Sequence, residues 1–359
     1  MAVYENWYAS RPAYFERVLR RARLYLFHIV EETHRRGLPT EIALLPMVES
    51  AFEPRARSRS GAVGLWQFIP TTGKGYGLRQ NGWYDERRDV ISATRAALDY
   101  LEFLHSEFDG DWFLALAAYN AGENRVRKAM NFNRRRGRST HYTALQLRAE
   151  TKRYVPKLIA IRNIIAAPHE HAIRLAPIAN EPFFARLELE GPLDLTLAAK
   201  LGGVSLKTMH ALNPAPSNGI TPPDGPRRLL VPVGGAPRMR AALRALPREQ
   251  RVRWLQHTVT SGEYLGRIAR RYDVGVADIK RVNRLRGDLL RVGQHLVIPV
   301  RADPAGTPRD AHLHLVRRGD TLWAISRRYG VYVSQLAQWN GISTADVLRV
   351  GQQIVVRGE

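Results

Sequence analysis

One glutamate, Glu49, stands in the most apolar surroundings of any acidic residue in the sequence. It follows the run Ile-Ala-Leu-Leu-Pro-Met-Val at residues 42–48 and closes a helix expected over residues 40–49. An apolar environment and the negative end of a helix both disfavour the ionised carboxylate, so both raise its pKa. A carboxylic acid that stays protonated near neutral pH can act as a general acid. On its neighbours alone, an ordinary exposed helix glutamate is the alternative interpretation.

Other reactive groups are scarce, which narrows the chemistry. The sequence contains no cysteine, and this excludes disulfides, zinc–thiolate sites, iron–sulfur clusters and cysteine nucleophiles. The 11 histidines form no H-x-x-x-H or H-E-x-x-H pattern, and no glycine-rich phosphate loop is present. We therefore expect a site with no metal and no cofactor.

Glu49 belongs to the first of four short motifs that carry polar or aromatic side chains, and the other three follow it along the chain. The first holds Glu49 itself, with Ser58 nine residues later; the others are Gly-Leu-Trp-Gln-Phe-Ile-Pro at 64–70, Ala-Tyr-Asn-Ala-Gly at 118–122 and Glu-Thr-Lys-Arg-Tyr-Val-Pro-Lys at 150–157. The residues of interest in these motifs are Ser58, Gln67, Tyr119, Asn120, Glu150 and Tyr154. Taken singly, Ser58 is more typical of a turn, Gln67 of a polar surface and Tyr119 of a core tyrosine with a satisfied hydroxyl.

Helices must position these motifs. Apolar residues recur at three-and-four spacing in several segments of the first half, and no alternating strand pattern appears before about residue 183. The expected helices cover 12–36, 40–49, a segment capped by Asp89, a segment capped by Asp111, and 150–166. Residues 1–178 are thus predicted to form an all-α domain.

The second half contains an internal repeat. Residues 257–272 match 314–329, and both copies close on Leu-Arg-Val-Gly-Gln, at 290–294 and 348–352. A weaker third copy lies at about 184–233, and each copy is typical of a strand, two helices and a strand. The positions that recur 57 residues apart include Gly262, Leu265 and Asn283, which return as Gly319, Leu322 and Asn340.

The predicted fold class is therefore α+β with several domains. After the helical domain we expect a degenerate module at 179–236, a repeat at 255–301 and a repeat at 312–359. The segments between them, 237–254 and 302–311, are rich in Arg, Pro, Gly and Ala and are predicted to be linkers.

The repeats resemble the LysM module, a small βααβ unit that binds glycans containing N-acetylglucosamine. The resemblance implies glycan contacts from the loop after the first strand and the loop after the second helix. The candidate positions are Gly262, Leu265, Asn283, Gly319, Leu322 and Asn340. Considered as residues alone, most of these are core or turn positions, and Asn283 and Asn340 are more typical of helix caps.

The four motifs of the helical half resemble the soluble lytic transglycosylase (goose-lysozyme-like) superfamily. Residues 1–300 are similar to the membrane-bound lytic murein transglycosylase D family, including Asn-Glu-Pro-Phe-Phe at 180–184. The resemblance implies that Glu49 is the single catalytic acid/base. It implies further that substrate contacts come from Ser58, Gln67, Tyr119, Asn120, Glu150 and Tyr154.

The reaction that the resemblance implies uses one carboxylate where ordinary glycosidases use two. The acetamido group of the substrate is then expected to stabilise the positive centre. Glu49 would protonate the β-1,4 oxygen between N-acetylmuramic acid and N-acetylglucosamine, then accept the proton of the muramoyl 6-hydroxyl, leaving a 1,6-anhydromuramoyl end. A hydrolysing muramidase of the same fold and a catalytically silent peptidoglycan-binding scaffold are the alternatives.

The net charge of +22, from 55 Lys+Arg and 33 Asp+Glu, favours anionic partners. Because the aromatic residues do not interleave with the basic ones, nucleic acid ranks last among them. We expect peptidoglycan strands as the partner, a monomer, and action in the bacterial cell envelope or periplasm. The sequence shows no secretion signal and no apolar run of membrane length, so the export signal and any outer-membrane anchor are expected to lie outside it.

Overall fold

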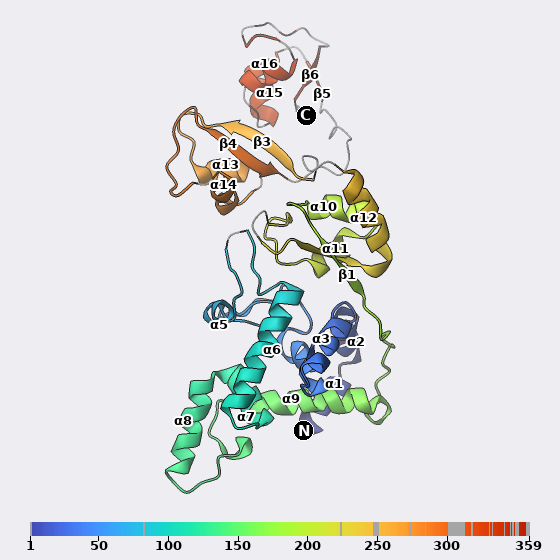
Figure 1. The fold of residues 1–359 in the computed structure, drawn as a ribbon. Helices are drawn as coiled ribbons and strands as arrows, with labels where there is room; N and C mark the ends of the chain where they lie inside the picture. The colour runs from blue at the N-terminus through green and yellow to red at the C-terminus, as the bar shows by residue number, and fades with distance from the viewer. Residues whose placement is uncertain are drawn as a thin grey trace. The chain divides into compact units, whose positions relative to one another are not determined.

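The computed structural model describes residues 2–356 except 82, 223–224, 247–250, 273, 284, 301–312, 317–318, 330, 332, 341, 345, 347 and 349–351. The chain forms two compact units, 1–302 and 303–359 (Figure 1). The second expected linker, 302–311, lies outside the described residues. Among the helices that the structure describes, none has the length and apolarity needed to cross a bilayer.

Residues 2–171 are helical, as predicted, and the first described strand begins only at Phe184. Helix α9 packs against α1 and α7, and α6 packs against α7, around one apolar core (Figure 1). The elements are α1 (Ala2–Ala9), α2 (Pro12–Ala22), α3 (Leu26–Arg35), η1 (Thr40–Leu44), α4 (Leu45–Ser50), α5 (Pro70–Gly75), α6 (Val90–Glu107), α7 (Trp112–Ala121), α8 (Glu123–Arg134), η2 (Tyr142–Ala144), α9 (Ala149–Ala166) and η3 (Pro168–His171).

Two predicted helices are interrupted. The segment 12–36 breaks into α2 and α3 at Tyr25, whose ring is buried and whose hydroxyl donates to the carbonyl of Ala211 at 2.9 Å. The segment 40–49 begins as the 3₁₀ helix η1 and continues as α4. Pro46 explains this change, because it has no amide hydrogen to continue an α-helix from the turn before it.

The caps predicted at Asp89 and Asp111 are confirmed. The Asp89 carboxylate accepts from the amide of Ser92 at the start of α6, and the Asp111 carboxylate accepts from the amides of Phe113 and Leu114 at the start of α7. Each cap satisfies amides that have no partner inside the helix, which fixes where these helices begin.

The three copies in the second half are βααβ units, as predicted, and each has its own antiparallel pair of strands and its own core. The first has β1 (Phe184–Glu188), α10 (Leu195–Gly202), α11 (Leu206–Leu212) and β2 (Arg228–Pro232). The second has β3 (Arg253–Thr258), α13 (Leu265–Arg271), α14 (Val276–Val282) and β4 (His295–Val300). The third has β5 (Leu313–Leu315), α15 (Leu322–Tyr329), α16 (Val333–Asn340) and β6 (Gln353–Val355).

The prediction that residues 237–254 form a linker is wrong for the first half of this segment. After the short 3₁₀ turn η4 (Val233–Gly235), residues 236–245 form helix α12 (Ala236–Ala245), and Met239 and Leu243 are buried in the core of the first βααβ unit. A proline in the first turn is compatible with a helix, and Ala, Arg, Met and Leu are good helix formers, so the Arg- and Pro-rich composition concealed an amphipathic helix. We call residues 183–246, α12 included, the docked module. The other domain boundaries stay predictions.

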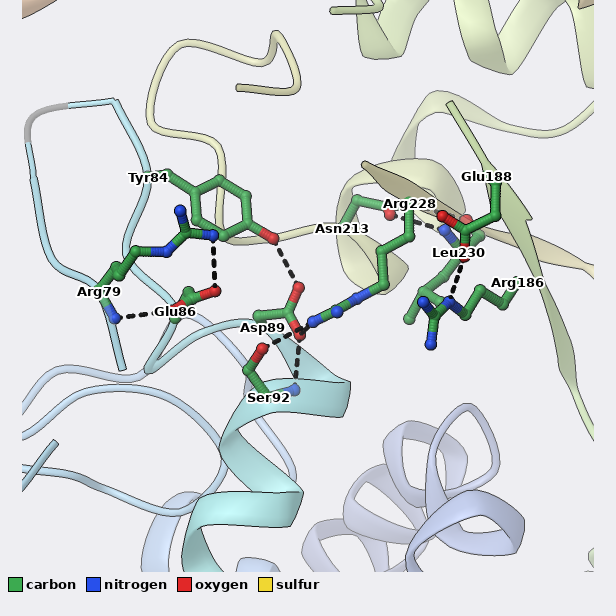
Figure 2. A network of polar contacts seen from close by, with 10 residues as sticks. All are labelled: Arg79, Tyr84, Glu86, Asp89, Ser92, Arg186, Glu188, Asn213, Arg228 and Leu230. Carbon is green, nitrogen blue, oxygen red and sulfur yellow. Dashed lines mark hydrogen bonds and ion pairs between the residues drawn. The ribbon is translucent and has the colours of Figure 1, made fainter. Parts of the chain in front are cut away.

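The docked module is held against the helical half by a loop between α5 and α6. Trp83 is fully buried; its indole nitrogen donates to the carbonyl of Ile220 at 2.8 Å, and its own carbonyl accepts from the amide of Ser217 at 2.8 Å. Beside it, Arg228 of β2 donates to the Asp89 carboxylate and, at 2.7 Å, to the Ser92 hydroxyl (Figure 2). The N-terminus of α6 and the docked module therefore share one polar network.

Candidate active site

The backbone after Glu49 turns sharply. Ala51, which ends α4, and Phe52 both have left-handed backbone conformations, with φ angles of 50° and 53°. Two successive non-glycine residues of this kind are costly and persist only where the surroundings fix them. The Phe52 side chain is fully buried, and its amide donates to the carbonyl of Pro46 at 3.0 Å. This reversal ends the helix immediately after the glutamate.

A cavity of about 410 Å³ opens beside Glu49. Its walls come from α4, the loop before α5, α6, α7 and α9. All seven residues expected in the active site line it, namely Glu49, Ser58, Gln67, Tyr119, Asn120, Glu150 and Tyr154. Four motifs spread over about a hundred residues thus meet at one place.

The Glu49 carboxyl is held in a setting that favours its protonated form. Burial raises its pKa to about 7, the negative charge of Glu150 adds to the rise, and Lys157 opposes it. The buried Tyr154 hydroxyl donates a hydrogen bond to Oε1 of Glu49, which lowers the pKa but does not cancel the effect of burial. A carboxyl with a pKa near 7 is available both as an acid and as a base at neutral pH.

Tyr119 and Gln67 are fixed through the loop before α5. The Tyr119 hydroxyl donates to the carbonyl of Trp66 at 2.9 Å, and the Trp66 indole donates to the Thr94 hydroxyl of α6 at 3.0 Å. Gln67 has a φ angle of 48°, and its amide donates to the carbonyl of Gly64 at 2.9 Å. At Gly64 itself, a Cβ atom would lie 2.0 Å from the carbonyl oxygen of Arg87, so only glycine fits.

The remaining predicted residues are Asn120 and Ser58, which are half-buried, and Glu150. The Asn120 side-chain oxygen accepts from the Thr151 hydroxyl of α9 at 2.8 Å, which leaves its amide group to serve as a donor toward the cavity. The Ser58 hydroxyl accepts from the amide of Ala62 at 3.0 Å and bonds to the Ser60 hydroxyl at 2.9 Å. Glu150 is exposed at the start of α9.

Some residues of the cavity wall were not predicted from the sequence. Tyr100 of α6 lines the cavity, its ring lies between Tyr76 and Tyr119 with centroids 5.0 and 5.5 Å away, and its hydroxyl donates to Glu123 at 3.1 Å. In the sequence it follows the apolar spacing of α6 and is indistinguishable from a core tyrosine. Lys157 could have been predicted from the sequence, because it belongs to the motif at 150–157.

The candidate glycan residues of the repeats support the fold. Gly262 and Gly319 have φ angles of 78° and 95°, which turns require of glycine, and the side chains of Leu265 and Leu322 are buried. Asn340 donates to the carbonyl of Leu336 at 2.7 Å.

Asn283 bonds to the backbone of β4 in both directions, donating to the carbonyl of Val297 and accepting from its amide, each at 2.7 Å. Asn213 bonds in the same way to Leu230 in the docked module. Asn283 and Asn340 each bond to a carbonyl in the last turn of their own helix, and Asn283 also joins this helix end to β4. These roles agree with the alternative interpretation of core, turn and cap positions; glycan contact through the loop backbones stays a prediction.

Comparison with protein families matches three kinds of domain in this chain. Residues 28–142 match the transglycosylase SLT domain, residues 257–299 and 314–357 match the LysM domain, and residues 183–248 match the LysM-like domain of lytic transglycosylase MltD. The matched ranges follow the helical half and the three βααβ units in order.

Among relatives, membrane-bound lytic murein transglycosylase D of Escherichia coli (strain K12) is 37% identical over 349 residues, which are 93% of this chain and 76% of the relative. Peptidoglycan transglycosylase gp16 of Escherichia phage T7 is 43% identical over 79 residues, 22% of this chain and 6% of the relative. The solved structure of lytic transglycosylase Slt from Pseudomonas aeruginosa shares 29% identity over 41% of this chain and 24% of that one, with a TM-score of 0.32. Because 93% of its length matches the E. coli protein and it contains an MltD LysM-like domain, the chain belongs to the membrane-bound lytic murein transglycosylase D family.

Proposed function

We propose that this lytic transglycosylase cleaves the β-1,4 bond between N-acetylmuramic acid and N-acetylglucosamine in peptidoglycan, with Glu49 as its single acid and base. One observation carries the proposal: the Glu49 carboxyl, with a pKa of about 7, lies in a cavity lined by every other residue expected to contact substrate. A volume of about 410 Å³ is in the range that binds small organic groups such as sugar rings.

The first step is protonation of the leaving oxygen. Because the Tyr154 hydroxyl donates to Oε1, the acidic proton of Glu49 belongs on Oε2. Transfer of this proton to the glycosidic oxygen breaks its bond to muramoyl C1, and N-acetylglucosamine leaves with a free 4-hydroxyl. The substrate's own acetamido oxygen stabilises the positive charge at C1. We expect the Asn120 amide to orient that group as a donor and the Gln67 side-chain oxygen to orient it as an acceptor, because the amide hydrogens of Gln67 already donate to the carbonyls of Gly64 and Ala56.

The second step returns the proton. The muramoyl 6-hydroxyl attacks C1 and its proton passes to the Glu49 carboxylate, so the enzyme is restored and a 1,6-anhydro ring is formed without consumption of water. A hydrolysing muramidase would differ only here, because water would then attack C1.

The decisive experiment is digestion of purified peptidoglycan followed by mass spectrometry of the muropeptides. We expect anhydro ends, lighter by one water than hydrolysis products. Glu49→Gln should lower the rate about a thousandfold or more, because no other group can donate the proton. The matched control is Glu41→Gln, which changes an exposed carboxylate of η1 outside the cavity and should retain the activity. Products heavier by one water, or an active Glu49→Gln variant, would contradict the proposal.

The pH dependence gives an independent test of the same residue. Glu49 donates only in its protonated form, which is depleted above its pKa, so kcat/KM should fall as the pH rises above about 7. The Tyr154 hydrogen bond lowers this pKa. Tyr154→Phe should therefore move the alkaline limb to higher pH, and an unmoved limb would assign it to another group.

The family places the enzyme in the bacterial cell envelope, on peptidoglycan. Two finer points belong to the proposal: association with the outer membrane, and a monomeric state. Cell fractionation and analytical ultracentrifugation test them. The net charge of +22 supports concentration of the enzyme on the anionic groups of the wall.

A further inference from the structure

A second cavity, of about 260 Å³, adjoins the catalytic cavity at the end of α7. The two cavities share Ala121 and Gly122 as lining residues. Beyond these, the second cavity is lined by the first turns of α8, namely Glu123, Asn124, Arg125 and Lys128. We call it the cationic annex. Because the walls are shared, a group bound in the catalytic cavity can extend a substituent into the annex.

Two cations dominate this annex. Arg125 and Lys128 are exposed, and their spacing of three residues places them on the same side of α8. Arg125 donates to the carbonyl of Ala121 at 3.0 Å, which holds its guanidinium at the boundary between the two cavities. Arg127, between them in sequence, is instead bound to Glu107 at 3.0 Å.

The one acid of the annex is already engaged. Glu123 accepts from the hydroxyl of Tyr100, a residue of the catalytic cavity wall, at 3.1 Å. Its carboxylate is thereby held toward the aromatic side of the catalytic cavity. Arg125 lies two residues and Lys128 five residues along α8 from Glu123, and together they supply two positive charges against its single negative one.

We propose that Arg125 and Lys128 bind a carboxylate of the peptide stem that is attached to the muramoyl sugar. This inference rests on the proposed function, because Glu49 acting at muramoyl C1 puts a muramoyl residue, with its peptide, in the catalytic cavity. The sugars of the strand are neutral, whereas the stem peptides carry free carboxylates. A guanidinium binds a carboxylate through two parallel hydrogen bonds, and a neighbouring ammonium adds to the attraction. The annex therefore favours strands that still bear their peptides.

The test compares two substrates: peptidoglycan strands with their stem peptides, and stripped strands, from which an amidase has removed the peptides and in which the lactyl carboxylates that it exposes have been converted to amides. For the double variant Arg125→Ala/Lys128→Ala we expect KM on peptide-bearing strands to rise about tenfold with kcat little changed. On stripped strands the double variant should equal the wild type. Raised ionic strength should reduce the wild-type preference for peptide-bearing strands, because the annex is exposed and screened by salt.

The matched control is Arg134→Gln/Arg135→Gln, which removes the same charge from the other end of α8, outside the annex. It should leave the preference unchanged. Equal losses of the annex variant on both substrates, no loss on either, or an equal loss in the control would each overturn the inference. The anhydro product on stripped strands reports the Glu49 chemistry separately, so a failure of the annex and a failure of the proposed function are distinguishable.

Discussion

The docked module and the repeat at 257–299 have the same βααβ order but use their loops differently. In the docked module, the loop after α11 bonds to Trp83, and the Leu195 amide donates to the carbonyl of Gly219 at 2.8 Å, which joins the two loops to each other. In the repeat, the equivalent loops carry exposed apolar side chains: Tyr264 is 54% exposed and Leu289 is 89% exposed. The loops of the docked module are therefore closed by contacts with other parts of the chain, whereas the loops of the repeat are open to solvent.

A βααβ fold therefore does not by itself define a glycan site. The closed loops of the docked module are occupied by the chain itself, with Trp83, Tyr84, Ala215 and Ile220 in one buried cluster. Helix α6 connects the docked module to the catalytic cavity. Arg228 of the docked module binds Asp89 at the N-terminus of α6, and Tyr100 of the same helix lines the cavity. We therefore expect the docked module to support the site, and the open repeats to be the glycan-binding modules.

The strongest challenge to this comparison is removal of the indole that closes the loops. Trp83→Ala should reduce the free energy of unfolding by about 3–5 kcal/mol, because it empties a fully buried site and removes the bond to Ile220. Urea unfolding followed by circular dichroism measures the loss. Trp83→Phe keeps most of the packing and should cost less. A loss below about 1 kcal/mol for Trp83→Ala would show that the docked module is not supported by this contact.

The second challenge concerns charge at the same interface. Arg228 and Asp89 have side chains only 12% and 10% exposed, so Arg228→Ala leaves a carboxylate nearly buried without its cation, at a cost of about 3 kcal/mol. The control is Arg186→Ala, in the same module (Figure 2). Its ion pair with Glu188 has side chains 53% and 67% exposed, and its loss should change stability by no more than about 0.5 kcal/mol. Equal melting shifts for the two variants would remove the distinction between interface and surface.

Much of this architecture is accessible from the sequence, because it depends on local signals. The caps Asp89 and Asp111, the absence of early strands and the βααβ repeats follow from cap chemistry and periodicity. The apolar run before Glu49 indicates a raised pKa, and burial raises it to about 7. The grouping of the other six site residues came from the family resemblance, since no spacing rule connects motifs a hundred residues apart.

What the sequence leaves hidden depends on distant partners. The bond from Trp83 to Ile220 joins residues 137 positions apart, and the buried ring of Tyr25 interrupts an apolar pattern that otherwise continues into α3. Tyr100 has the spacing of a core residue, although its ring also lines the cavity. Such roles are set by tertiary contacts, which single-sequence periodicity does not report.

The smallest effect on stability is expected at the open loops, where the comparison predicts a change in binding instead. Tyr264 and Trp323, 54% and 60% exposed in the two repeats, should be replaceable together by alanine with a change in unfolding free energy within about 0.5 kcal/mol. Both repeats are changed together because two linked modules mask the loss of one. Cosedimentation with peptidoglycan should weaken about tenfold, since exposed aromatic rings supply much of the contact energy with a ligand.

The control for this last variant is Leu206→Ala, which removes an exposed apolar side chain from the docked module and should alter neither stability nor binding. Cleavage of short soluble glycan fragments should be unaffected by either change, because Glu49 and its cavity lie outside the repeats. If cosedimentation is unchanged in the double variant but lost in Leu206→Ala, the functions assigned to open and closed loops are reversed. The docked module, rather than the repeats, would then hold the enzyme on the wall.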